Sequence, residues 1–336
     1  MVTGRITLHE VAAEAGVSKS SVSNVIRNQP HVRESVRKRV YDAIEKLGYR
    51  PLAIGQNLVT GSTGVVALAI PNFAQPYFAE VARAAVAAAS RHGLKLIVQQ
   101  TDNDLVRERE VADAWNLGAA DGLIFSPSTI TDEEIEERRG GMPLVLLGER
   151  SKLKSVDRVG IDSVAIAKLA TQHLIEQGRR HVAMIGHKDS GDPFVVHERE
   201  EGFHKALAEA GLVEATPIGY VQDWTRQDGE AAMAALLERG DRIDAIFCAN
   251  DLLALGAMKT LAERGIAVPA EVAIIAVDDI EEASFANPSL SSVFIDRTWM
   301  MDKAFALLST RLKDPLSPPQ QVEVPFRLEV RSSTGA

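Results

Sequence analysis

Residues 7–51 read TLHEVAAEAGVSKSSVSNVIRNQPHVRESVRKRVYDAIEKLGYRP, and this stretch decides the fold of the N-terminal part of the chain. Its first segment places apolar residues from Leu8 to Ala15 at helical spacing, on one face of a short helix. Thr7 can cap the start of that helix and Gly16 can end it. Ser18 can cap a second helix shortly afterwards. The sequence therefore predicts two short helices joined by a tight turn.

The second predicted helix has an apolar inner face and a polar outer face. Val22, Val25 and Ile26 form the inner face. The outer face carries Lys19, Ser20, Ser23, Asn24 and Arg27. Short polar side chains of this kind fit the major groove of DNA, where they meet base edges. A third amphipathic segment, residues 34–47, closes a three-helix core, so the stretch predicts a small all-α helix-turn-helix head.

The charge of the chain is divided unevenly. The whole sequence has a net charge of −9, which by itself argues against DNA binding. Residues 1–60 nevertheless hold nine Lys and Arg against five Asp and Glu, a net charge of +4 that leaves −13 for the remainder. A basic head on an acidic body indicates that only the head approaches a polyanion. The basic residues 37–39 can meet phosphate or can simply be solvated, and both interpretations stay open.

The head resembles that of the lactose/galactose repressor family, whose pattern is roughly T-x-x-D/E-V-A-x-x-A-G-V-S-x-x-T-V-S-R-V-L-N followed by a third helix ending L-G-Y-x-P. The matching residues are Thr7, Val11, Ala12, Ala15, Gly16, Val17, Ser18, Val22, Ser23, Leu47, Gly48, Tyr49 and Pro51. This resemblance implies a transcriptional regulator, a repressor that binds a palindromic operator in double-stranded DNA. It also implies a homodimer and control by a small-molecule effector.

The resemblance implies that the head reads the operator with one helix. The residues implied in DNA contact are Thr7, Ser18, Lys19, Ser20, Ser21, Ser23, Asn24, Arg27 and Asn28. Lys19 and Ser20 occupy the first two base-reading positions of the family, and Asn24 stands where the third reader is usually Arg. Because Arg favours guanine and Asn favours adenine, we expect an operator that departs from the family's usual one at that base pair.

Residues 51–61, PLAIGQNLVTG, resemble the family's hinge, which becomes a short helix only on operator DNA. Leu58 would then wedge into the minor groove beside its counterpart from a second subunit, with Ala53 and Asn57 flanking it. Gly55 stands where alanine is common and costs such a helix about 1 kcal/mol. The alternative is a plain linker, to which the glycines of this segment are well suited.

After residue 61 the sequence alternates short apolar runs with amphipathic segments. The predicted strands are residues 65–70, 94–99, 122–126, 143–148, 159–161, 181–186, 218–221, 244–249, 272–277 and 291–296. The predicted helices are residues 78–91, 105–117, 163–177, 198–210, 227–239 and 251–264. This alternation predicts an α/β body of two doubly wound parallel sheets, with ligands at the carboxyl ends of the strands and a cleft between two lobes.

The family resemblance extends through the body, down to residues 248–280, and implies a two-lobed periplasmic-binding-protein-like fold. The predicted boundaries are a helix-turn-helix domain at 1–50, a hinge at 51–61, a first lobe at 62–161 with about 291–320, and a second lobe at 162–290 with about 321–336. In this division the strand 291–296 and the helix after it rejoin the first lobe.

Polar and aromatic side chains at the predicted strand ends indicate where an effector binds, and the family resemblance implies ligand contacts for Arg199, Trp224, Asn250 and Asp278. The candidate residues are Asn72, Phe73, Tyr77, Phe78, Ser126, Asp162, Arg199, Trp224, Asn250 and Asp278. Carboxylate, amide and guanidinium groups among aromatic walls suit a polyhydroxylated ligand such as a sugar, while Arg199 could equally grip a carboxylate or phosphate. Phe78 and Trp224 have a second interpretation as core residues, and Asp162 as a helix cap. Asp251 and Asp279 are interpreted as caps rather than ligands.

Other features of the sequence limit the functions that are possible. The sequence lacks the glycine-rich, nucleophile-elbow and metalloprotease motifs of enzymes, so we expect no catalytic residues, no metal and no cofactor. Cys248 is the only cysteine and sits in an apolar run, as a buried core residue would. No apolar run spans a membrane and no secretory signal is seen, so a cytoplasmic protein is expected. The Ala-rich segment 78–91 favours a dimer. A sugar-binding protein of transport, without DNA readout, is the alternative function.

Overall fold

A computed structural model of the chain describes residues 6–26, 29, 32–49, 62–114, 120–149, 151–187, 194–212 and 216–335. The chain divides into two compact units, Met1–Thr63 and Gly64–Ala336, here called the head and the body. Each is described by itself.

The head contains three helices around a small apolar core. They are α1 (Leu8–Ala15), α2 (Lys19–Ile26) and α3 (Glu34–Leu47). Thr7 begins α1 in a reciprocal capping box, because its hydroxyl accepts from the Glu10 amide while its own amide donates to the Glu10 carboxylate at 2.7 Å. Gly16 ends the helix in a left-handed conformation, with φ at 62°, which only glycine adopts without strain. Val11, Val22 and Val40 meet in the core, so the predicted three-helix arrangement is confirmed.

The body contains two six-stranded sheets. The first has the order β11-β5-β4-β3-β1-β2 and all its strands run parallel. Its strands are β1 (Val65–Ile70), β2 (Lys95–Gln100), β3 (Gly122–Phe125), β4 (Leu144–Gly148), β5 (Asp157–Gly160) and β11 (Gln321–Glu323). We call this sheet and the helices packed on it the first lobe.

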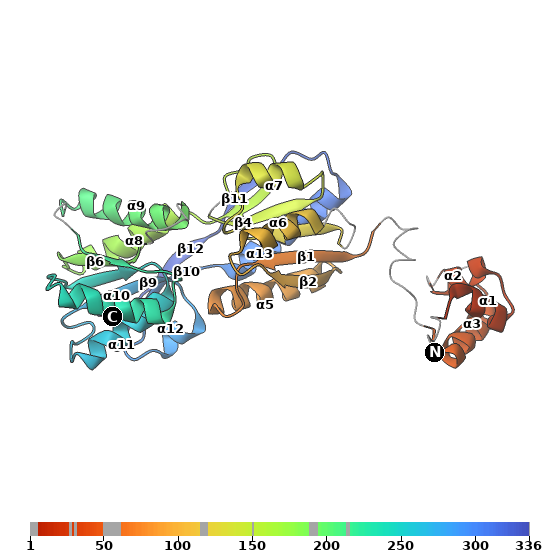
Figure 1. Ribbon diagram of the computed structural model, residues 1–336, viewed down its shortest axis with the longest axis horizontal. Coiled ribbons are helices and arrows are strands. Elements are labelled where there is room, and N and C mark those ends of the chain that lie inside the picture. The colour runs from red at the N-terminus through yellow and green to blue at the C-terminus, as the bar shows by residue number, and fades with distance from the viewer. Residues whose placement is uncertain are drawn as a thin grey trace. The chain divides into compact units, whose positions relative to one another are not determined.

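The second sheet has the order β12-β10-β9-β8-β6-β7, and only β12 runs antiparallel to its neighbour. Its strands are β6 (Val182–His187), β7 (Ile218–Tyr220), β8 (Ala245–Cys248), β9 (Ala273–Asp278), β10 (Ser291–Ile295) and β12 (Phe326–Glu329). This sheet and its helices form the second lobe, and the two lobes lie end to end in the body (Figure 1).

Helices cover both faces of each sheet because alternate strand residues point to opposite faces and both sets are apolar. In the first lobe, Val66 and Leu68 of β1 belong to the cluster formed with α5 and α13, whereas Ala67 and Ala69 pack with α6 and α7. These helices are α5 (Pro76–Arg91), α6 (Leu105–Ala114), α7 (Asp132–Arg138) and α13 (Arg297–Lys313). The fold class predicted from the alternation is therefore confirmed.

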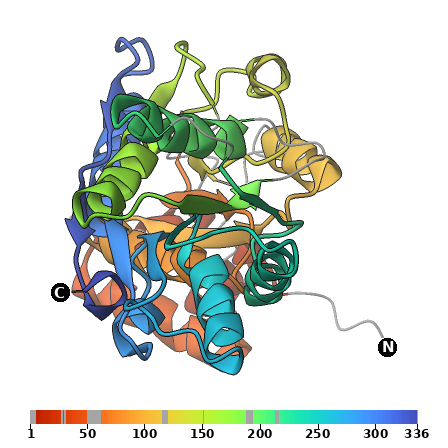
Figure 2. The same ribbon diagram turned by 90° about the vertical axis from the view of Figure 1, so that its left-hand side faces the viewer.

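The second lobe repeats this layering. Its helices are α8 (Ser163–Glu176), α9 (Phe194–Glu209), α10 (Arg226–Glu238), α11 (Asp251–Glu263) and the short α12 (Glu281–Phe285). In the end-on view of Figure 2, the green α8 and α9 lie on one side of the sheet and the teal and cyan α10 and α11 on the other. None of the helices in the described residues is long and apolar enough to span a bilayer.

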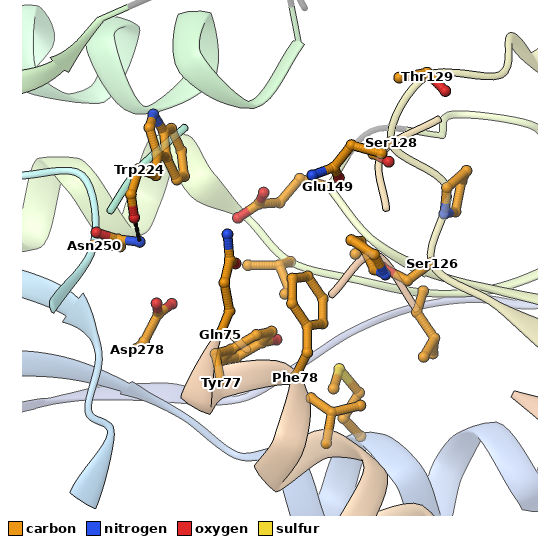
Figure 3. A pocket seen from close by; sticks show the side chains of 18 of the residues that line it. Gln75, Tyr77, Phe78, Ser126, Ser128, Thr129, Glu149, Trp224, Asn250 and Asp278 are labelled. Carbon is orange, nitrogen blue, oxygen red and sulfur yellow. Dashed lines mark hydrogen bonds between the residues drawn. The ribbon is translucent and has the colours of Figure 1, made fainter. Parts of the chain in front are cut away.

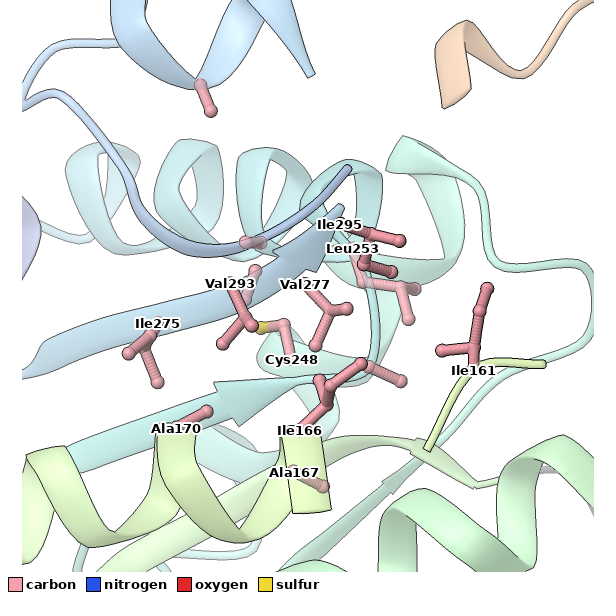
Figure 4. Packing of buried hydrophobic residues seen from close by; sticks show 14 of the residues in the cluster. Ile161, Ile166, Ala167, Ala170, Cys248, Leu253, Ile275, Val277, Val293 and Ile295 are labelled. Carbon is pink, nitrogen blue, oxygen red and sulfur yellow. The ribbon is translucent and has the colours of Figure 1, made fainter. Parts of the chain in front are cut away.

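Cys248 lies at the centre of the second lobe, between the sheet and α8. Its side chain is fully buried and packs with Ile166 and Val293, which Figure 4 shows converging from the helix and from β10. Burial raises the pKa of this thiol far above its usual range, so it stays protonated and unreactive. The prediction of a core residue is confirmed.

One predicted connection is wrong. The strand 291–296 was expected to rejoin the first lobe, but β10 lies in the second sheet, between β9 and β12. The chain returns to the first lobe only with α13, and it leaves again after β11. Local apolar patterning identifies a strand but not its neighbours, and Ser291 and Ser292 are buried there because their hydroxyls have partners within the second lobe.

The lobes are joined by three chain crossings, after β5, after β10 and after β11. These crossings are hydrogen-bonded to one another. The Val324 amide donates to the Gly160 carbonyl at 2.8 Å, and the Asp296 amide donates to the Pro325 carbonyl at 3.1 Å. The carboxyl ends of the strands of both sheets therefore border one shared space.

Candidate functional site

A cavity of about 390 Å³ lies between the lobes, at the carboxyl ends of their strands. Its size is within the usual range for small-molecule sites. Figure 3 shows Trp224, Asn250 and Asp278 of the second lobe facing Phe78, Ser126 and Glu149 of the first. Among the predicted effector residues, those that line the cavity are Tyr77, Phe78, Ser126, Arg199, Trp224, Asn250 and Asp278.

The first lobe supplies an aromatic wall. Pro76 begins α5, where its missing amide hydrogen costs nothing, and Tyr77 and Phe78 follow in the first turn with their rings edge to face at 5.2 Å. Burial raises the pKa of Tyr77 well above its usual range, so its hydroxyl stays protonated and can donate a hydrogen bond. Ser126 directly follows β3, and its amide donates to the Ala69 carbonyl at 2.9 Å.

The second lobe supplies a rigid polar wall. Asn250 caps α11 by accepting from the Leu253 amide at 2.9 Å, and its amide nitrogen donates to the Trp224 carbonyl at 3.3 Å. Trp224 has a φ of 56°, a conformation that costs energy for a residue other than glycine. Its indole nitrogen donates to the Gly186 carbonyl at 3.0 Å, which holds the ring against the cavity. Trp224 and Phe78 line the cavity and also pack against the main core cluster, so each of the two roles considered for them describes part of their surroundings.

Arg199 and Glu149 join the two lobes inside the cavity. The Arg199 guanidinium donates to the Glu149 carboxylate at 2.7 Å, and both side chains are at least nine-tenths buried. Glu149 also accepts from the Ser163 hydroxyl. The Arg199 guanidinium lies 5.1 Å from the centre of the Trp224 ring, within the range of a cation–π interaction.

Asp278 ends β9 and faces the same space. Burial raises the pKa of its carboxyl to about 7, against the opposing attraction of Arg199 and Arg297. Arg297 fixes this loop, because it donates to the carbonyl oxygens of Asp278 and Asp279 and pairs with Glu80 of the first lobe at 2.8 Å. The main chain at Asp278 is therefore held in place, and the pKa of about 7 means that the carboxyl changes its charge near neutral pH.

The head presents the polar face predicted for α2. Lys19 and Ser20 are exposed, Ser23 and Asn24 are half-buried, and Val22 and Val25 point inward. The Ser18 hydroxyl accepts from the Ser21 amide at 3.1 Å and so caps the helix, while Thr7 caps α1. The other predicted DNA-binding residues, Arg27, Asn28, Ala53, Asn57 and Leu58, lie outside the described residues.

Comparisons with known proteins decide the family. Residues 7–51 match the bacterial regulatory proteins of the lacI family, and residues 171–334 match the periplasmic binding protein-like domain. The chain is 31% identical to catabolite control protein A of Priestia megaterium, over 98% of this chain and 99% of that protein. It is 32% identical to the HTH-type transcriptional repressor PurR of Actinobacillus pleuropneumoniae, over 97% and 98% of the two chains.

The chain belongs to the lacI family of bacterial regulatory proteins. It is a DNA-binding transcriptional regulator. Solved structures agree. A LacI-family regulator from Sanguibacter keddieii is 37% identical with a TM-score of 0.74, over 81% of this chain and 99% of that one. The regulator CelR, solved as a cellobiose complex, is 30% identical with a TM-score of 0.73, over 98% of this chain and 100% of that one.

Three residues predicted to bind the effector are not brought into the cavity wall of this LacI-family regulator. Asn72 accepts from the Ala74 amide at 2.7 Å in a turn after β1, and the neighbouring Phe73 is 43% exposed. Asp162 caps α8 by accepting from the Ala165 amide at 2.9 Å, which is the alternative role considered for it. A strand end alone does not show which way the side chains of the following loop point.

The interpretation of Asp251 and Asp279 as helix caps is wrong. Asn250 is the cap of α11, and Asp251 lies inside that helix, fully buried, accepting from the Ser292 hydroxyl and the Ile280 amide. Burial raises the pKa of Asp251 well above its usual range. Asp279 pairs with Arg331 at 2.6 Å, and its main chain is left-handed with a φ of 52°. Neither residue lines the cavity.

Other wall residues were not among the sequence candidates, including Gln75, Asn103, Ser128, Thr129 and Asp223. Ser128 and Thr129 belong to the loop after β3, and the buried carboxylate of Glu108 organises that loop. Glu108 accepts from both hydroxyls and from the amides of Ser128, Thr129 and Ile130 at 2.5–2.9 Å. The proximity of Ser128 and Thr129 to Ser126 was an available signal, but nothing in the sequence marks Glu108 as their partner.

No group of His, Cys, Asp or Glu among the described residues is arranged to hold a metal ion. The cavity wall is instead a set of hydrogen-bonding groups and aromatic faces. This chemistry is suited to binding and orienting a small polar molecule.

Proposed function

We propose that this regulator is a repressor that binds a palindromic operator as a homodimer, and that a small polyhydroxylated effector in the cavity changes its affinity for DNA. The observation that carries the proposal is the cavity itself, because its walls come from both lobes. A ligand that contacts both walls binds one arrangement of the lobes better than another, and such differential binding is what shifts a conformational equilibrium.

The character of the cavity wall supports a sugar. Aromatic faces at Tyr77, Phe78 and Trp224 suit the apolar faces of a pyranose ring, and Asn250 and Asp278 supply hydrogen-bonding groups for hydroxyls. CelR, which is 30% identical over almost the whole chain, was solved with cellobiose.

The homodimer is supported by an exposed apolar surface. A groove runs between α5 and α12, lined by Ala79, Leu255 and Phe285 together with acidic residues. The Phe285 side chain is 79% exposed, which is unusual for a large aromatic group. We propose that a second copy of the chain covers this groove and so sets the spacing of two heads on the operator. The proposal includes a cytoplasmic location, because operator DNA is bound there.

The test is an in vitro selection of bound DNA from random fragments with the full chain, at moderate and high salt, with and without a panel of sugars. The proposal expects a palindromic site of roughly 16–20 base pairs whose binding weakens steeply with salt. It also expects at least one sugar to shift binding. If no fragment is enriched under any condition, the proposal is wrong. The alternative, a binding protein without DNA readout, is then favoured.

A further inference from the structure

The charges that face the cavity are unbalanced. Among the described residues that line it, Arg199 is the single base, whereas Glu149, Asp223 and Asp278 are acids. Glu149 and Asp278 are buried, where charges interact more strongly than in water. The field inside the cavity therefore disfavours an anion unless Arg199 is available to pair with it.

Arg199 is already engaged. Its Nη2 donates to Glu149 at 2.7 Å, its Nη1 donates to the Ala249 carbonyl, and its Nε lies 3.5 Å from the Ser163 hydroxyl. Three of the five guanidinium N–H groups thus have an acceptor from the protein, and one is left on each of Nη1 and Nη2. A phosphate or carboxylate bound at the remaining N–H groups would lie beside the buried Glu149 carboxylate and be repelled by it, and displacing Glu149 would leave a buried charge without its partner.

We propose that the cavity accepts an uncharged polyhydroxylated ligand and excludes phosphorylated and carboxylated ones, with Glu149 as the residue that sets this specificity. This inference rests on the effector site of the proposed function. It decides between the two ligand classes that the sequence leaves open for Arg199. Hydroxyl groups donate to carboxylates, so Glu149 and Asp278 attract a sugar for the same reason that they repel an anion.

The aromatic wall of the cavity also suits an uncharged ligand. The Arg199 guanidinium lies over the Trp224 ring, 5.1 Å from its centre, and Trp224 lines the cavity, where an aromatic face suits a neutral ring. Asp278, when ionised, adds negative charge to the same second-lobe wall (Figure 3), and burial raises the pKa of its carboxyl to about 7.

The first experiment uses sulfate as the probe and needs no knowledge of the natural ligand. The full-length wild type and the E149Q variant are titrated with sodium sulfate at constant ionic strength, and binding is followed by tryptophan fluorescence and thermal unfolding. In E149Q, Arg199 loses its charged partner, so sulfate should bind about tenfold or more tightly than in the wild type.

Two controls make the sulfate result specific. E198Q removes a neighbouring carboxylate on α9 that pairs with Lys152 at 2.7 Å and does not line the cavity, so it should behave as the wild type. The double variant E149Q/R199Q should lose the gained binding. Equal sulfate binding by wild type and E149Q, or a gain that survives in the double variant, would overturn the proposal.

A second experiment uses only the wild type, in case the variant does not fold. Matched pairs are compared by calorimetry: glucose with glucose 6-phosphate, ribose with ribose 5-phosphate, and cellobiose with cellobionate. Tighter binding of a neutral member supports the proposal. Tighter binding of an anionic member, or no binding by any member, contradicts it. The DNA selection is a separate measurement. If it enriches no operator while sulfate binds as expected, the proposed function is refuted but the proposed ligand class is not.

Discussion

At the scale of single residues, burial decides chemistry that the sequence alone leaves open. Asp278 follows an apolar strand, and that position predicts a cavity residue. Its raised pKa is caused by desolvation, against the attraction of Arg199 and of Arg297, which comes from the next chain crossing. The sequence likewise marks Arg199, but not that Glu149 neutralises it. A residue at a strand end can be predicted because the strand itself can be predicted from the sequence. The partner that another element brings to that residue cannot be predicted in this way.

The pKa of Asp278 predicts how stability depends on pH. A carboxyl whose pKa is about 7 when folded and ordinary when unfolded stays protonated only in the folded chain between about pH 4 and pH 7. Stability therefore falls as the pH rises through this window. Relative to D278N, the wild type should lose up to about 4 kcal/mol of unfolding free energy across it. Urea unfolding at a series of pH values measures the difference.

The exposed Asp42 provides the control for this prediction, because D42N should leave the pH dependence of the wild type unchanged. A difference between wild type and D278N that stays constant from about pH 4 to pH 7 would contradict the assignment.

Asn24 predicts the base preference of the head. It lies half-buried on the outer side of α2. Substitution N24R should move one base pair of each half-site from adenine towards guanine, with discrimination of about 1–3 kcal/mol. Selection with both proteins compares the sites directly, and an unchanged consensus would show that Asn24 does not read DNA.

At the scale of elements, the apolar patterning predicts the body well. β1 spans the predicted residues 65–70, and most other predicted strands and helices begin and end within a few residues of those observed. The short α7 and α12 are not predicted, because a helix of one or two turns has too few residues to show a period. The sheet to which β10 belongs is set by pairing between distant segments, which local patterning does not contain.

The loop after β3 depends on one residue of α6. Glu108 is fully buried and accepts five hydrogen bonds from Ser128, Thr129 and Ile130. Substitution E108Q replaces a carboxylate acceptor with an amide nitrogen that faces donors, so we expect a loss of about 2 kcal/mol or more in unfolding free energy. Ligand binding should weaken as the loop loses its order.

Chemical denaturation of E108Q and of E133Q tests this role, since Glu133 is exposed on α7 and its substitution should change stability by less than about 0.5 kcal/mol. Equal stability of E108Q and E133Q would show that the loop does not depend on Glu108.

At the scale of the whole molecule, the cavity exists because the chain crosses between the lobes three times. The two-lobed body is predictable from the number of strand and helix units and from the family resemblance. The order of the crossings is not, since the last two depend on where short strands near the C-terminus pair. The homodimer is proposed from the structure of the body, and the exposed groove between α5 and α12 supports it.

The groove predicts how the dimer can be broken. Substitution F285E places a charge where a second copy is expected to bury an aromatic ring, so the chain should become monomeric and bind operator more weakly. Sedimentation shows the oligomeric state. L316E is the matched control, because Leu316 is also highly exposed but lies in a turn after α13, away from the groove. A dimer that persists in F285E would place the interface elsewhere.

The affinity of the full chain for its selected operator, measured at fixed salt with and without a sugar shown to bind the cavity, tests the central claim most directly. In the wild type, saturating sugar should change the operator Kd by about fivefold or more, the usual range of allosteric coupling. In D278N, which lacks one carboxylate of the cavity wall, the same sugar concentration should have little effect. A sugar that saturates the cavity and leaves the operator Kd of the wild type unchanged would contradict the account.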